Sequence, residues 1–100
     1  MVAEPTIPTN RNVGVLVSGR GSNFRSLLDA KARGDLDANF TVVISNNPSA
    51  GAKAHAEEFG IPWVVIDHRT FASRQAFEEE LVAQLRAHDV SVVVLAGFMR

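Results

Sequence analysis

Four short apolar runs rich in β-branched residues alternate along this chain with stretches in which apolar residues recur three or four positions apart. The runs are Val13 to Ser18, Phe40 to Ser45, Trp63 to Ile66 and Ser91 to Ala96. Continuous apolar runs are typical of parallel strands buried on both faces, and the wider spacing is typical of amphipathic helices. The pattern therefore predicts an α/β fold, with a parallel sheet covered by helices.

Three helices are predicted between these strands. Their apolar faces are the sets Phe24, Leu27 and Leu28; Ala52, Ala56 and Phe59; and Phe77, Leu81, Val82 and Leu85. The first helix should run from about Ser22 to Arg33, where Gly34 can end it in the left-handed conformation. Pro48 and Gly60 bracket the second, whose small alanines allow close packing on the sheet. Ser73 can cap the third, whose glutamates at 78–80 should form a solvated face.

Crossovers between parallel strands are normally right-handed, so the first three strands should extend the sheet in one direction and the fourth should return to the other edge of the first. The expected strand order is 3-2-1-4, in a Rossmann-like, three-layer half-domain. In such sheets ligands bind at the carboxyl ends of the strands, where connections diverge. Residues 19–23 leave the first strand and residues 96–100 leave the fourth. Both segments should therefore border one crevice.

The composition narrows the class of protein. The chain has 100 residues, a net charge of −1 and no cysteine. It therefore lacks the basic field that nucleic acid or an anionic membrane would require, and it lacks disulfides and thiolate chemistry. Its apolar runs are shorter than the roughly 20 residues of a membrane span. We expect a cytoplasmic protein that binds neither nucleic acid nor membrane, with a flexible leader over residues 1–11 and one domain over residues 12–100.

The turn after the first strand is the main candidate for chemistry. Gly19 and Gly21 let the backbone approach an anion, and the following helix points its free N–H groups at it. Phe24 replaces the third glycine of a dinucleotide fingerprint, and no lysine follows Gly21 as a Walker-type loop requires. A terminal monophosphate remains, with Ser22 and Asn23 as further donors. The alternative is an ordinary tight turn between strand and helix.

Other polar residues have simpler interpretations. Asn46 and Asn47 precede Pro48 and favour a turn. The three histidines, His55, His68 and His88, have no metal-ligand spacing, so no metal is expected. Arg74 places a cation at the start of the third helix, where it opposes the helix dipole and so suggests a functional role. The alternative is a solvated arginine. Arg100, beside the crevice, could hold a carboxylate or a phosphate.

Four segments resemble, in order and spacing, the glycinamide ribonucleotide formyltransferase family: residues 18–23 (SGRGSN), 45–47 (SNN), 71–77 (FASRQAF) and 92–100 (VVVLAGFMR). The resemblance implies a nucleotide-binding transferase of purine biosynthesis. It would move a formyl group from the cosubstrate 10-formyltetrahydrofolate to the amine of 5′-phosphoribosylglycinamide. It further implies that Gly21, Ser22 and Asn23 bind the substrate phosphate, and that Arg74, Met99 and Arg100 bind folate.

The family's catalytic asparagine, histidine and aspartate lie downstream of the segment that ends at Arg100, so none is expected within this sequence. The hypothesis is that the chain is the amino-terminal part of a longer formyltransferase and is inactive alone. The fourth strand would then be covered by later strands or by a second copy in a homodimer. A stand-alone phosphosugar-binding module is an alternative. Another is a related enzyme that uses 10-formyltetrahydrofolate, such as a deformylase, although water as acceptor needs no phosphate site.

Overall fold

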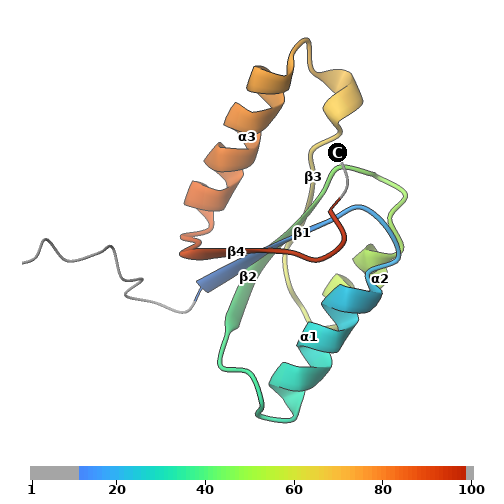
Figure 1. Ribbon diagram of the computed structural model, residues 1–100, viewed down its shortest axis with the longest axis vertical. Helices are drawn as coiled ribbons and strands as arrows, with labels where there is room; N and C mark the ends of the chain where they lie inside the picture. Colours follow the sequence, from blue (N-terminus) through green and yellow to red (C-terminus); the bar gives the residue numbers. More distant parts are fainter. Residues whose placement is uncertain (1–11, 99–100) are drawn as a thin grey trace, which may run out of the picture.

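The computed structural model describes residues 12–98, and these form one four-stranded parallel sheet with helices on both faces (Figure 1). The elements in chain order are β1 (Asn12–Val17), α1 (Ser22–Ala32), β2 (Asn39–Ser45), α2 (Ala52–Glu58), β3 (Trp63–Val65), the 3₁₀ helix η1 (His68–Thr70), α3 (Arg74–Ala87) and β4 (Val92–Leu95). The strand order is β3-β2-β1-β4, which confirms the predicted topology. Helices α1 and α2 lie on one side of the sheet and α3 lies on the other (Figure 1).

The central strand β1 is buried on both faces, because alternate side chains of a strand point to opposite sides of the sheet. Val15 and Val17 pack with residues of α1 and α2 in one apolar cluster. Leu16 points the other way and packs with Phe77 of α3 in a second cluster. β2 divides its side chains in the same manner. This two-sided burial is why the runs in both strands are continuously apolar.

Most predicted helix signals are confirmed. Gly34 follows α1 with φ of +84°, in the left-handed region. The Oγ of Ser73 accepts a hydrogen bond of 3.1 Å from the backbone N–H of Ala76 and so caps α3. Ala52 and Ala56 are completely buried against the sheet. Both ends of α1 and the start of α3 lie within one residue of their predicted positions, whereas α2 begins four residues after Pro48.

Two residues assigned to apolar helix faces lie elsewhere. The side chain of Phe59 is 36% exposed and carries the guanidinium of Arg25 over its ring, with 5.1 Å between the carbon of that group and the ring centroid. Val82 is 43% exposed. Phe77, Leu81 and Leu85 follow one another at intervals of four and face the core, and Val82 is turned about 100° from Leu81 around the helix. It therefore falls outside the buried stripe.

The η1 helix was not predicted from the sequence. The side chain of Asp67 accepts a hydrogen bond of 3.0 Å from the backbone N–H of Arg69 and starts this short turn. Ring packing also supports the segment, because His68 and Phe71 both meet the edge or face of Phe77 in T-shaped contacts. η1 therefore ties the loop after β3 to α3.

β4 is an edge strand among the described residues, since it pairs with β1 and with no other strand there. Val92 and Val93 are partly exposed and Leu95 is 66% exposed. An apolar edge of this kind is a template for pairing with another segment. The coverage of β4 by later strands or by a second copy of the chain remains a prediction. Within residues 12–98, no helix has the length and apolar character of a membrane span.

Candidate functional site

The turn between β1 and α1 has the geometry of an anion site. Gly21 adopts φ of 82° and ψ of 29° at the start of α1, and no side chain caps this helix end. The first backbone N–H groups of a helix have no partner inside the helix, and the helix dipole makes this end positive. Ser22 and Asn23, the first two residues of α1, are both exposed. Their amide and side-chain donors are therefore available to a ligand.

The end of β4 lies across from this turn. A hollow of about 150 Å³ is lined by Gly19, Arg20, Gly21, Ser22, Asn23, Ala96 and Gly97. The backbone N–H of Ala96 donates a 2.9 Å hydrogen bond to the carbonyl of Leu16, which keeps the end of β4 against β1. The structure thus brings the two segments together as the sequence predicted. Arg20 is the one ionisable side chain of this lining, so the hollow favours an anion and offers no acid or base.

A second hollow, of about 270 Å³, adjoins the first at the end of β1. It is lined by Ser18, Asn46, Asn47, His68 and Arg69. The guanidinium of Arg69 donates to both carboxylate oxygens of Asp67, at 3.0 and 2.8 Å. These bonds lower the pKa of Asp67 to about 2. His68 lines this second hollow and not the hollow beside β4.

Asn46 has a position that sequence reasoning missed. Its side chain is 4% exposed, and its Oδ1 accepts a 2.8 Å hydrogen bond from the Oγ of Ser18. Asn47 behaves as predicted for a turn, because its Oδ1 accepts a 2.9 Å hydrogen bond from the backbone N–H of Ser49. The signal that could have singled out Asn46 is its place directly after a buried strand, next to the strand that carries the glycine turn.

The residues that the resemblance assigns to folate are only partly within the described chain. Met99 and Arg100 lie outside residues 12–98. The side chain of Arg74 is 70% exposed and pairs with Glu78 at 3.4 Å. Pairs this exposed contribute little to stability, so Arg74 is free to exchange its partner for a ligand carboxylate.

Histidines and acidic residues do not form a metal site in the described part of the chain. His88 lies at the end of α3, with its Nδ1 2.9 Å from the carbonyl of Gln84. His55, in α2, is solvent-accessible.

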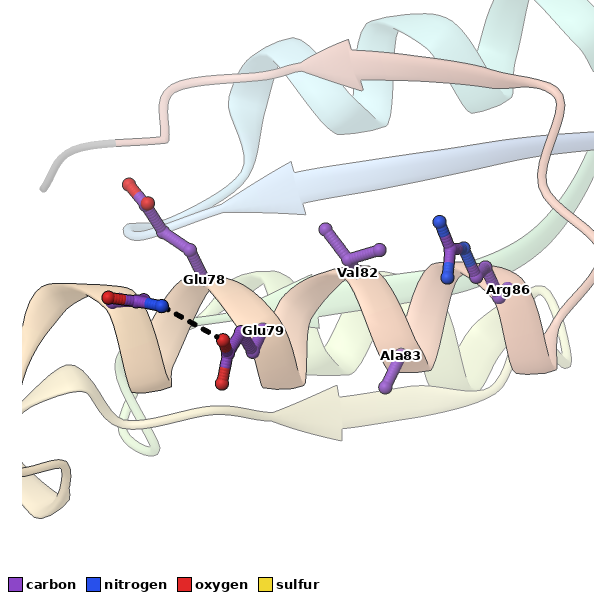
Figure 2. A pocket seen from close by; sticks show the side chains of 6 residues that line it. Glu78, Glu79, Val82, Ala83 and Arg86 are labelled. Atoms are coloured by element: carbon purple, nitrogen blue, oxygen red, sulfur yellow. Dashed lines mark hydrogen bonds between the residues drawn. The ribbon is translucent and has the colours of Figure 1, made fainter.

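Another hollow is on the outer surface of α3, away from the turn. It measures about 390 Å³ and is lined by Gln75, Glu78, Glu79, Val82, Ala83 and Arg86. Figure 2 shows the labelled side chains spread along a single helix. The side chain of Gln75 donates a 3.2 Å hydrogen bond to Glu79. No second element closes over them, and two carboxylates repel an anion. This surface therefore lacks the hydrogen-bond donors that converge on the hollow between the start of α1 and the end of β4.

Comparison with known proteins identifies relatives of this chain. The Formyl transferase family model matches residues 11–100. The trifunctional purine biosynthetic protein adenosine-3 of Drosophila melanogaster is 44% identical over 93 residues, which cover 90% of this chain and 7% of that protein. The phosphoribosylglycinamide formyltransferase of Bacillus subtilis (strain 168) is 32% identical over 90 residues, covering 90% of this chain and 46% of that protein.

Solved structures agree as well. The phosphoribosylglycinamide formyltransferase from Coxiella burnetii, solved in complex with CHES, superposes with a TM-score of 0.87 and 36% identity over 91% of this chain and 43% of that one. Glycinamide ribonucleotide transformylase 1 from Geobacillus kaustophilus gives a TM-score of 0.86 and 32% identity over 91% of this chain and 48% of that one. The chain thus spans less than half the length of these relatives. On the family match and the shared fold, it belongs to the formyl transferase family.

Proposed function

We propose that the protein transfers a formyl group from 10-formyltetrahydrofolate to the amine of 5′-phosphoribosylglycinamide in purine biosynthesis, and that this chain supplies the phosphate-binding part. The observation that carries the proposal is the uncapped start of α1 at Gly21, which opens on the hollow shared with the end of β4. Relatives that bear this activity in their names support it, at 32% identity in Bacillus subtilis and 36% in Escherichia coli.

The 5′-phosphate would sit at the start of α1. Its charge would be met by the backbone N–H groups that follow Gly21, by the positive end of the helix dipole and by the donors of Ser22 and Asn23. Arg20 adds a positive side chain to the same lining. The sugar and its glycinamide group would then extend past Ala96 toward the end of β4. The phosphate acts in this scheme as an anchor that orients the amine.

Folate would approach from the β4 and α3 side. We propose Arg74, Met99 and Arg100 as its binding residues, with the two arginines facing carboxylates of the cosubstrate. Formyl transfer also needs a base to take the proton of the attacking amine and a donor for the oxyanion that forms. Neither an acid nor a histidine lines the hollow beside β4 among the described residues. We therefore assign these steps to residues beyond Arg100 and expect residues 1–100 alone to be inactive.

The test is a steady-state assay of the protein at its natural length, comparing wild type with Asn23→Ala. Hydrogen bonds to a charged group contribute about 1.5–3 kcal/mol, which corresponds to a rise of about 10- to 100-fold in KM for phosphoribosylglycinamide. The turnover number should change little, because the phosphate takes no part in the chemistry. Asn39→Ala is the matched control, since Asn39 is an exposed asparagine at the opposite end of the sheet.

Two results would contradict the proposal. An unchanged KM in Asn23→Ala would reject Asn23 as a phosphate ligand. Release of formate from 10-formyltetrahydrofolate at full rate without any amine acceptor, and with no response to Asn23→Ala, would instead indicate a deformylase. A protein that binds phosphoribosylglycinamide but ignores a folate analogue would be a phosphosugar-binding module.

A further inference from the structure

We propose that Ser18, Asn46 and Asn47 are positioning residues that hold the glycine turn, residues 19–23, in the conformation that binds phosphate. The inference rests on the proposed function of that turn. None of the three is part of the lining of the hollow beside β4. They line the neighbouring hollow at the ends of β1 and β2 instead. Their effect on phosphate must therefore pass through the turn.

Three hydrogen bonds connect the start of the turn to the segment between β2 and α2. The Oγ of Ser18 donates to Oδ1 of Asn46 at 2.8 Å. The Nδ2 of Asn47 donates to the backbone carbonyl of Ser18 at 3.3 Å. The backbone N–H of Ala52 donates to the carbonyl of Gly19 at 3.2 Å. The first two residues after β1 are therefore held by two residues of the connection between β2 and α2 and by the first residue of α2.

The supporting segment is itself fixed. The hydroxyl of Ser45, which is fully buried, donates to the carbonyl of Asn47 at 2.9 Å and accepts from the backbone N–H of the same residue at 3.0 Å. Asn47 in turn accepts from the N–H of Ser49 through its side chain. Asn46 is buried beside them. A binding turn supported on such a segment is ordered before its ligand arrives, which lowers the entropic cost of binding.

Packing transmits the same constraint to the donors. A Cβ placed on Gly21 would lie 2.5 Å from the Cβ of Ala52, so the turn rests directly on the start of α2. If the Ser18–Asn46 bond is lost, the segment leading into Gly21 can shift, and with it the N–H groups of Ser22 and Asn23. Displacements of about 1 Å are enough to impair a preorganised site.

The experiment measures binding of ribose 5-phosphate by calorimetry to the protein at its natural length. Ser18→Ala and Asn46→Ala should each raise the dissociation constant about 3- to 10-fold, as expected for one hydrogen bond. The double variant should lose less than the sum of the two single losses, because both changes remove the bond between Ser18 and Asn46. Ser18→Thr keeps the hydroxyl and should restore binding. In the formyl transfer assay, KM for phosphoribosylglycinamide should rise while the KM for the formyl donor stays unchanged.

Asn39→Ala is again the matched control. The Nδ2 of Asn39 donates to Oδ1 of Asn12 at 2.9 Å, so this variant also removes a side-chain hydrogen bond between the ends of β1 and β2. It should leave the dissociation constant unchanged, because it acts at the end of the sheet far from the turn. Equal losses in Asn39→Ala and Ser18→Ala would mean a merely structural role and would overturn the inference.

The two proposals fail in different ways. If wild type does not bind ribose 5-phosphate, the phosphate function of the turn fails and the inference fails with it. If wild type binds and both Ser18→Ala and Asn46→Ala bind as tightly, only the positioning role is overturned. Because Asn46 is buried and its variant can fold poorly, Ser18→Ala, at a partly exposed residue, tests the same bond independently.

Discussion

Replacing Gly21 with alanine tests both the backbone conformation and the packing of the glycine turn. The residue has φ of +82°, which L side chains rarely adopt. The added Cβ would lie 2.5 Å from the Cβ of Ala52 and 2.9 Å from its Cα. Carbon atoms in contact are normally about 3.5–4.0 Å apart, so relief requires a movement of roughly 1 Å against Ala52, which is completely buried at the start of α2.

The two costs can be estimated separately. A left-handed backbone costs a residue other than glycine about 1–2 kcal/mol. Forcing a methyl group into a packed site costs about 1–3 kcal/mol more. We therefore expect Gly21→Ala to lower the free energy of unfolding by roughly 2–5 kcal/mol, a large part of the roughly 5–15 kcal/mol typical of a domain.

Urea unfolding followed by circular dichroism measures this loss, with Gly34→Ala as the matched control. Gly34 has φ of +84°, and a Cβ there would meet no atom within 4 Å. The control should therefore lose only the backbone cost of about 1–2 kcal/mol. In a double-mutant cycle, Ala52→Gly should recover part of the loss in Gly21→Ala by removing the nearer of the two contacts. Equal unfolding free energies for Gly21→Ala and Gly34→Ala would refute the packing argument.

Two further predictions concern charge and the sheet edge. The hydrogen bonds from Arg69 depress the pKa of Asp67 to about 2 from an ordinary 3.8, so their stabilisation should be present above pH 4 and lost as the pH falls through 2. In Arg69→Ala, the pKa of this carboxyl, measured by NMR titration, should move back toward 3.8. An unmoved pKa would contradict the assignment. Leu95→Lys places a charge on the exposed edge strand β4 and should reduce self-association of the 100-residue chain, measured by sedimentation velocity. Val82→Lys, at an exposed residue of α3, is the control and should leave self-association unchanged. Equal effects of the two variants would argue against pairing through β4.

The sequence predicted the sheet well because β1 and β2 are buried on both faces and so carry uninterrupted apolar runs. Helix faces were predicted less well at their margins. Periodicity places Phe59 and Val82 near the apolar face of their helices, but it does not say how much of each helix the sheet covers. The guanidinium of Arg25 in α1 lies over the ring of Phe59, which directly follows α2, and no local pattern encodes this contact.

The glycine turn and its meeting with the end of β4 followed from topology and could be predicted. The role of Asn46 was not predicted, because an asparagine two residues before a proline favours a turn whether its side chain faces solvent or accepts a hydrogen bond from the end of another strand. The role of Asn46 depends on its hydrogen bond with Ser18, which lies 28 positions earlier in the chain and is adjacent only after folding. The sequence also gave no direct sign of the short η1 helix, which depends on a side-chain cap from Asp67.

The contact between Gly21 and Ala52 links ligand binding to the folding of a large part of the chain. The turn can take its binding shape only after β2 has paired with β1 and α2 has docked, since its supports come from residues 46–52. A ligand that binds only this assembled form stabilises it by mass action. Phosphorylated substrate should therefore protect backbone amides throughout residues 12–58 from hydrogen exchange, well beyond the atoms it touches. In that sense the substrate would act as a folding cofactor for β1, α1, β2 and α2.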